Sequence, residues 1–269
     1  WRANAAIPGL RKSPRYFQIW LAVKLAQLGF RALKADSQIF IRDSDKSLLI
    51  IHVDDLMMIC SAAVHETLAA DIGKLVTLKP GVPLSESWTP YLGWEWRRVD
   101  RTRFEVRDPS KCIDKVLGML NMSSCKPLGS MTSMTGSSDI ENTSPPLDAL
   151  MHRKYRSIVG MLLWIAHLRF DVAFPVKELA RSASRPTERD LLRMKKVLRY
   201  LQGSRHCYID LAGHKLLDGE KLFISGFSDA SWATSGVDSK STSGGCIFGM
   251  NVLLTQWART QTTISMSSC

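Results

Sequence analysis

Two adjacent carboxylates, Asp54 and Asp55, stand between two apolar runs of the sequence. The runs, residues 47–51 and 56–60, are rich in Leu, Ile and Met and predict a buried hairpin with the carboxylates at its tip. Charges beside buried strands are costly unless they have a task, and phosphoryl transfer with two metals requires several convergent carboxylates. Because consecutive strand residues point to opposite faces, we expect Asp54 to be the full metal ligand. An ordinary Asp-Asp turn is the alternative when the motif is taken alone.

The charge of the chain favours a polyanionic partner. Its 269 residues include 36 Lys and Arg against 25 Asp and Glu, which gives a formal net charge of +11. Such an excess is typical of nucleic-acid-binding proteins, although a basic solvated surface would also explain it. The six cysteines are scattered without a C-x-x-C pair, so the sequence indicates no zinc site.

Helices and strands alternate irregularly along the chain, which predicts an α+β fold. A helix is expected from Ser13 and Pro14 to Gly29, and another helix opens with a near capping box at Thr187 and Asp190. A Ser-, Thr-, Gly- and Pro-rich stretch, residues 121–150, is the best candidate linker. Further predicted helices cover residues 64–76, 111–120 and 155–166, a hairpin covers 91–106, and a three-strand meander covers 222–257.

Residues 48–56 (Leu-Leu-Ile-Ile-His-Val-Asp-Asp-Leu) resemble the tyrosine-valine-aspartate-aspartate box of copia-type reverse transcriptases. Other segments resemble the same family in the same order, and this ordered set is far more specific than any single motif. These segments are residues 9–15 (Gly-Leu-Arg-Lys-Ser-Pro-Arg), 91–93 (Tyr-Leu-Gly), 155–160 (Tyr-Arg-Ser-Ile-Val-Gly), 197–203 (Val-Leu-Arg-Tyr-Leu-Gln-Gly), 228–233 (Ser-Asp-Ala-Ser-Trp-Ala), 241–245 (Ser-Thr-Ser-Gly-Gly) and 256–257 (Gln-Trp).

The resemblance implies a fragment of a retrotransposon Pol polyprotein, of the kind that serves DNA integration, with three parts. A partial reverse-transcriptase palm would span residues 1–108. Helical thumb and connection would span residues 109–215, with the linker near 121–150, and the N-terminal part of a ribonuclease H-like domain would span 216–269. We expect an intracellular protein, cytoplasmic or nuclear. No membrane partner is expected, because no apolar run approaches the ~20 residues that cross a bilayer.

The resemblance also implies roles for individual residues. Asp54 and Asp55 would hold Mg²⁺, or Mn²⁺ in its place, and Asp229 would be the first metal-binding carboxylate of the nuclease. Arg11, Lys12 and Arg15 would lie beside the nucleotide and template, and Leu92 and Gly93 beside the primer. The implied partners are an RNA template, a DNA primer, RNA–DNA hybrid, dNTPs and the rest of the polyprotein.

A basic stripe is predicted independently of the resemblance. Arg189, Arg193 and Lys196 recur at helical spacing away from the apolar positions and could follow a phosphate backbone. A solvated helix face is the alternative.

Departures from the family pattern bear on activity. His52 stands where the family has Tyr, so nucleotide handling would be altered, and Phe170 replaces a usual Pro. The family's first catalytic Asp lies upstream of Gly9, and residues 267–269 (Ser-Ser-Cys) stand where a nuclease Glu should follow soon. We therefore expect a chain that is inactive in isolation. The alternatives are a decayed remnant that only binds nucleic acid and a helical interaction module without a nucleic-acid role.

Overall fold

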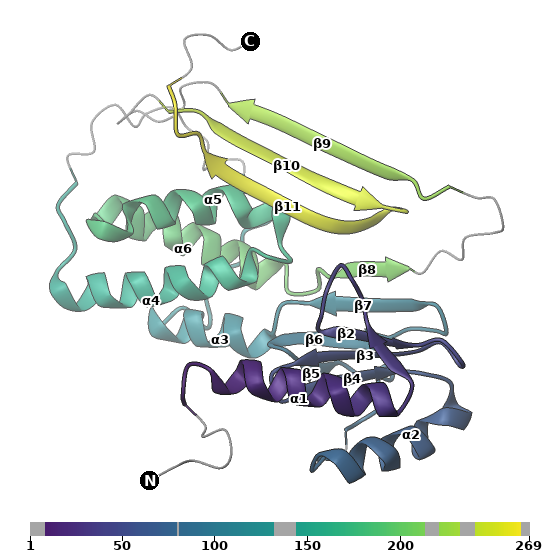
Figure 1. Ribbon diagram of the computed structural model, residues 1–269. Helices are drawn as coiled ribbons and strands as arrows, with labels where there is room; N and C mark the ends of the chain where they lie inside the picture. Colours follow the sequence, from purple (N-terminus) through teal and green to yellow (C-terminus); the bar gives the residue numbers. More distant parts are fainter. Residues whose placement is uncertain (1–8, 80, 132–143, 213–220, 232–239, 265–269) are drawn as a thin grey trace. The chain divides into compact units, whose positions relative to one another are not determined.

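The computed structural model describes residues 9–79, 81–131, 144–212, 221–231 and 240–264, in two compact units, residues 1–82 and 83–269 (Figure 1). Both units combine helices with strands, which confirms the predicted α+β class. Residues 132–143 of the predicted linker, together with residues 232–233 and 267–269, lie outside the described residues. None of the helices that the structure describes is long and apolar enough to cross a membrane.

The first unit is a four-stranded antiparallel sheet with two helices on one face. Along the sheet lie β1 (Phe30–Ala32), β2 (Ile39–Arg42), β3 (Ser47–His52) and β4 (Asp55–Ile59) in that order. In β3 the side chains alternate, so that Leu49 and Ile51 are buried beneath the helices. The helices α1 (Ser13–Gln27) and α2 (Ala62–Leu75) complete this core with Leu21, Leu25, Leu68 and Ile72.

The start of α1 differs by one residue from the prediction. Lys12 occupies the N-cap position without a side-chain capping bond, and Ser13 is already the first helical residue. Pro14 stands in the first turn, where its missing N–H costs no helical hydrogen bond. After the helix, Gly29 takes a φ of +83°, as expected for the residue that ends the pattern.

The second unit contains another four-stranded antiparallel sheet, of which the sequence predicted only the central hairpin. Its strands are β5 (Thr89–Tyr91), β6 (Trp94–Arg98), β7 (Arg103–Arg107) and β8 (Ile209–Ala212), each hydrogen-bonded to the next. Strand β8 comes about a hundred residues after β7. An ion pair between Arg103 and Asp210, 2.8 Å apart, joins these two strands across that interval.

Four helices form the main core of the second unit. They are α3 (Ser110–Met119), α4 (Ala149–Ile165), α5 (Phe170–Arg181) and α6 (Glu188–Gly203). Fully buried side chains come from all four, among them Val116, Leu162, Val176 and Leu198. The predicted capping box of α6 is confirmed, because Thr187 and Asp190 each accept a hydrogen bond from the other's backbone N–H.

The predicted three-strand meander is also confirmed. Strands β9 (Ile224–Ser231), β10 (Thr242–Gly249) and β11 (Val252–Thr260) form an antiparallel sheet with β10 in the middle. Strand β11 lies against α5 (Figure 1). The Gln256 side chain donates a hydrogen bond to the Ala166 carbonyl at 2.5 Å, and Lys177 donates to the Thr242 hydroxyl at 2.6 Å.

The predicted domain limits at residues 108 and 215 stay predictions. The two compact units meet in sequence at residues 82 and 83, and the sheet from β5 to β8 lies within the second unit.

Candidate functional site

The carboxylates Asp54 and Asp55 lie at the tip of the β3–β4 hairpin. His52 pairs with Asp55 in the antiparallel register, so that Val53 and Asp54 alone form the turn. The side chains of Leu49 and Ile51 in β3 are buried, whereas every side chain from His52 to Asp55 is exposed. The apolar strands therefore anchor a short rigid loop and present its carboxylates to solvent.

The backbone at this tip is strained. Val53 has a φ of +57°, in the left-handed region that a β-branched residue rarely adopts. Such outliers cost about 1–3 kcal/mol and cluster at functional sites, because surrounding structure must impose them. Here the two strands impose it through the His52–Asp55 pair. The strain thus lies beside the residues that the sequence singled out for chemistry.

The tip offers oxygen ligands of the type that Mg²⁺ prefers. Asp54 and Asp55 are adjacent, and neither forms an ion pair within the residues that the structure describes. In that same part of the chain, no group of three or more His, Cys, Asp or Glu side chains could hold a metal ion together. The donor chemistry of the pair therefore fits Mg²⁺, and further ligands would have to join these two.

The basic residues predicted to lie beside nucleotide and template are Arg11, Lys12 and Arg15. Arg11 and Lys12 form the turn that leads into α1, Arg15 lies in its first turn, and all three are exposed. No acidic residue occupies that first turn. The positive end of the helix dipole adds to the three cationic side chains, so this corner of the first unit suits an anion.

Leu92 and Gly93 form the turn between β5 and β6. Tyr91 pairs with Trp94, and both turn residues have positive φ angles, +50° and +78°. The Trp164 indole of α4 contacts this turn, because its Nε1–H donates to the Gly93 carbonyl over 3.4 Å. The predicted primer-contacting pair is thus a second strained two-residue turn, supported by Trp164, which follows Gly93 by 71 residues.

The basic stripe of α6 is less free than the sequence suggested. Arg189, Arg193 and Lys196 lie on the helix but are only half exposed. Arg193 lies 3.8 Å from the capping carboxylate of Asp190. Neighbouring Arg199 donates to the Lys126 carbonyl at 2.8 Å. Part of the positive charge therefore stabilises the helix and its surroundings.

Asp229 lies in β9, two residues before the strand ends at Ser231. Its side chain is exposed, and Oδ1 accepts a hydrogen bond from the Ala230 N–H at 2.8 Å. In the sheet it pairs with Gly244, whose own partner on the other side is Ala258. Small neighbours leave the carboxylate accessible, but no described residue joins it in a metal-binding group.

A buried ionic network was missed by the sequence reasoning. Arg169, only 4% exposed, donates to the Asp171 carboxylate at 2.7 Å and to the Ser204 hydroxyl at 2.6 Å, and lies 3.7 Å from Asp108. The Tyr200 hydroxyl also donates to Asp171 at 2.7 Å. The Arg169-Phe170-Asp171 triplet, with two opposite charges one residue apart, is the signal of this network in the sequence.

The pKa values of the two carboxylates in this network are shifted in opposite directions. Burial raises the pKa of Asp108, and the attraction of Arg169 compensates only in part. Burial acts on Asp171 too, but hydrogen bonds from Arg169 and Tyr200, with the charge of Arg169, outweigh it and hold the pKa of Asp171 below its ordinary value. The network joins the end of β7 to α5 and α6 and is therefore structural.

An aromatic and ionic cluster on the β5–β8 sheet also escaped prediction. The guanidinium carbons of Arg97 and Arg107 lie 4.6 and 4.1 Å from the centre of the Trp88 ring. Arg97 also forms an ion pair with Glu105 at 2.5 Å, and Arg107 forms one with Glu95 at 2.7 Å. Because the charges balance, the cluster stabilises the sheet and offers little net charge to a ligand.

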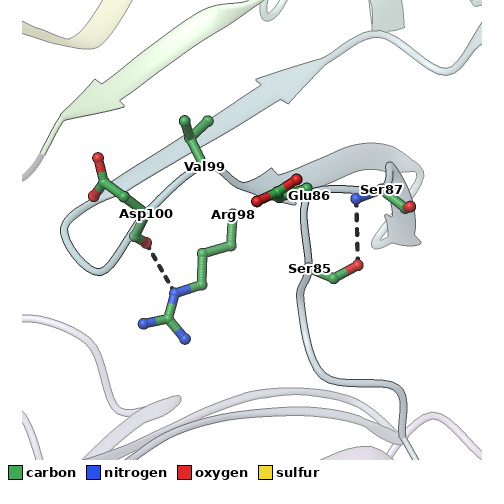
Figure 2. A pocket seen from close by; sticks show the side chains of 6 residues that line it. All are labelled: Ser85, Glu86, Ser87, Arg98, Val99 and Asp100. Carbon is green, nitrogen blue, oxygen red and sulfur yellow. Dashed lines mark hydrogen bonds between the residues drawn. The ribbon is translucent and has the colours of Figure 1, made fainter.

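A shallow hollow lies at the far end of the β6–β7 hairpin and contains none of the predicted site residues (Figure 2). Arg98 bridges its sides, because its backbone N–H donates to the Ser85 carbonyl at 2.7 Å and its Nε to the Asp100 carbonyl at 2.9 Å. The lining residues are Ser85, Glu86, Ser87, Arg98, Val99 and Asp100.

Comparison with known proteins identifies relatives over most of the chain. The retrovirus-related Pol polyproteins from transposons RE1 and RE2 of Arabidopsis thaliana are 28% and 27% identical over 251 residues, which are 92% of this chain. The uncharacterized mitochondrial protein AtMg00810 of the same plant is 30% identical over 161 residues, 59% of this chain and 62% of the relative. No family model and no solved structure matches the chain.

These similarities define a class of protein encoded by transposable elements. The chain belongs to the retrovirus-related Pol polyproteins of copia-type retrotransposons. It spans 16% of the length of the RE1 and RE2 polyproteins.

Proposed function

We propose that the chain is part of the reverse transcriptase and ribonuclease H region of its polyprotein. Within the intact polyprotein it would take part in RNA- and DNA-templated DNA synthesis and in cleavage of the RNA strand. The observation that carries the proposal is the strained, exposed hairpin tip with Asp54 and Asp55, in a chain whose relatives are Pol polyproteins. The proposed regions are the partial palm (1–108), thumb and connection (109–215) and nuclease start (216–269).

The proposed roles follow from where each side chain stands in its unit. Asp54 and Asp55 would hold Mg²⁺ from the hairpin tip, because their carboxylates are exposed on a short turn between anchored strands. Bound Mg²⁺ would stabilise negative charge that develops on the reacting phosphates. Arg11, Lys12 and Arg15 would attract the phosphates of nucleotide or template to the start of α1. Asp229 would bind metal for the nuclease.

Primer extension on an RNA template with Mg²⁺ tests this proposal. The 269-residue chain and a version extended upstream would be compared, each with Asp54→Asn and with Asp71→Asn, a control acid on α2. We expect extension only by the longer version, abolished by Asp54→Asn and retained in Asp71→Asn. Synthesis by the longer Asp54→Asn variant would refute the role of Asp54. Synthesis by the 269-residue chain that depends on Asp54 would refute only its predicted inactivity.

A non-catalytic protein that binds nucleic acid is the second candidate. The net charge of +11 favours it, because phosphate binding needs no convergent carboxylates. It predicts that the longer version binds RNA–DNA hybrid but never extends a primer. A helical interaction module, the third alternative, predicts no binding to the hybrid at any salt concentration.

Salt dependence measures how much of the basic surface is used. Binding of RNA–DNA hybrid should weaken steeply as salt rises, because each neutralised phosphate releases counterions. We expect Lys196→Gln to weaken binding at low salt and to reduce the slope of log affinity against log salt by about 1. Fluorescence anisotropy over a salt series provides this slope. Lys74→Gln, on α2, is the matched control, and an equal change in both variants would argue against the α6 stripe.

A further inference from the structure

The turn at Leu92 and Gly93 has a backbone that its sequence does not favour. In a two-residue hairpin with both central φ angles positive, Asn, Asp or Gly is preferred at the first position. Here Leu92 takes that position with a φ of +50°. A left-handed Leu is disfavoured because its Cβ crowds the following carbonyl. Surrounding structure must therefore impose this conformation.

One side chain outside the hairpin, Trp164 of α4, makes two contacts that can impose it and also fills the space beside Gly93. Its indole stacks on Trp94 with the ring centroids 4.6 Å apart and the planes 12° from parallel. Its Nε1–H donates to the Gly93 carbonyl over 3.4 Å. A Cβ at Gly93 would lie 3.0 Å from Trp164 Cζ2, so the indole occupies the space that a larger residue would need.

Trp164 makes these contacts from the surface of its helix. It remains 41% exposed, and the preceding Leu163 is 43% exposed, whereas Leu162 is fully buried. A surface indole contributes less to core burial than an internal one, so its contacts with the hairpin form a large part of what it does. The turn itself carries no charged side chain, since residues 91–94 are Tyr, Leu, Gly and Trp. Such a turn suits the sugars and bases of a nucleic-acid strand better than its phosphates.

We propose that Trp164 is the positioning residue of the Leu92–Gly93 turn and holds it in the geometry that contacts the primer strand of a primer–template hybrid. This inference rests on the proposed function. Trp164 itself acts through Gly93 and Trp94. The Trp stack fixes where β6 begins, and the bond to the Gly93 carbonyl fixes how the turn is rotated.

The experiment uses the 269-residue chain and two labelled hybrids with the same total number of nucleotides, and therefore the same charge. One has a recessed DNA 3′ end and the other is blunt. The variants are Trp164→Leu, Trp164→Phe and the neighbouring surface control Leu163→Ala. Anisotropy gives the ratio of the two affinities for each variant. Circular dichroism reports the stack, because two indoles in close contact couple through their in-plane transition dipoles, and the resulting exciton couplet disappears when one is replaced.

We expect the wild-type chain to prefer the recessed hybrid and to show the couplet. Trp164→Leu should lose the couplet and reduce the preference about two- to tenfold, the size of effect that an aromatic pair exerts on an equilibrium constant. Trp164→Phe keeps a stacked ring but loses the bond to the Gly93 carbonyl, so it should retain only part of the preference. Leu163→Ala should behave as wild type.

The other outcomes separate the two ideas. A wild-type chain that binds neither hybrid would overturn the proposed function and the positioning role with it. Binding without preference for the recessed end would overturn the positioning role alone. The same holds if Trp164→Leu remains folded, loses the couplet and keeps the full preference.

Discussion

At the scale of single residues, the buried carboxyl of Asp108 makes stability depend on pH. Its side chain is 3% exposed, and within the described part of the chain its Oδ2 accepts no hydrogen bond. The pKa is raised above the ordinary 3.8 by burial, so the folded chain keeps this proton where the unfolded chain has released it. The stability that Asp108 contributes is therefore complete below pH 3.8 and lost as pH rises through the raised pKa.

Asp108→Asn should remove this dependence, because an amide does not ionise. We expect the free energy of unfolding of the wild-type chain to fall relative to that of Asp108→Asn as pH rises above 3.8. Urea unfolding of both chains over a pH series measures the difference. Asp171 has a lowered pKa, so the stability that it contributes is lost as pH falls. This loss is the same in both chains. A constant difference over the whole series would contradict the prediction.

The strained Val53 leads to a second prediction at this scale. Val53 is 60% exposed, so its replacement sacrifices little burial, while Gly adopts a φ of +57° without steric cost. We expect Val53→Gly to stabilise the first unit by roughly 0.5–1 kcal/mol, after the extra freedom of Gly in the unfolded chain is counted. Chemical denaturation, monitored by hydrogen exchange in β3 and β4, measures this gain in stability. Val53→Ala keeps a Cβ and should gain less; equal gains would mean that the backbone is not the cause.

The candidate site could be predicted where its signal is local. Asp54 and Asp55 stand out because both strands and both carboxylates lie between residues 47 and 59. Trp164 and Arg169 could not be found in this way, because their partners Gly93 and Ser204 are 71 and 35 residues away. Contacts over such intervals depend on how helices pack, which periodicity in the sequence does not specify.

At the scale of elements, α6 owes its beginning to a reciprocal cap. The Thr187 hydroxyl accepts from the Asp190 N–H, and the Asp190 carboxylate accepts from the Thr187 N–H at 2.9 Å. Thr187→Ala should destabilise the second unit by about 1 kcal/mol, because one N–H at the helix start loses its partner. Thr187→Ser keeps the hydroxyl and should retain most of the stability. Urea denaturation compares them, and equal losses in both variants would argue against the cap.

The elements that the sequence predicted are those with long regular patterns. Helices α1 and α6 and the β9–β11 meander were found because apolar residues recur over two or more turns or strands. Strands β1, β2, β5 and β8 have only three or four residues each, too few for a period to appear. Helix α5 was missed as well. It contains a buried Pro175, which in a sequence normally indicates a break.

At the scale of the whole molecule, each compact unit has its own core. Leu49 is fully buried in the core of the first unit and Leu162 in that of the second. We expect Leu49→Ala and Leu162→Ala each to cost about 2–5 kcal/mol, through lost burial and the cavity that remains. Hydrogen exchange should locate the first loss in β2 and β3 and the second in α3 to α6. Equal loss of protection in both units from either substitution would contradict separate cores.

Strand β9 ends its sheet without a partner among the described strands, and its Ile224 and Phe227 side chains are 58% and 63% exposed. Natural edge strands commonly carry a lysine, a proline or a bulge, and β9 contains neither lysine nor proline. Two such edges must meet before they can pair. The rate at which soluble chain is lost on storage should therefore rise with the square of its concentration. Dilution would then prolong the shelf life of a preparation, because it makes encounters between two β9 edges rarer.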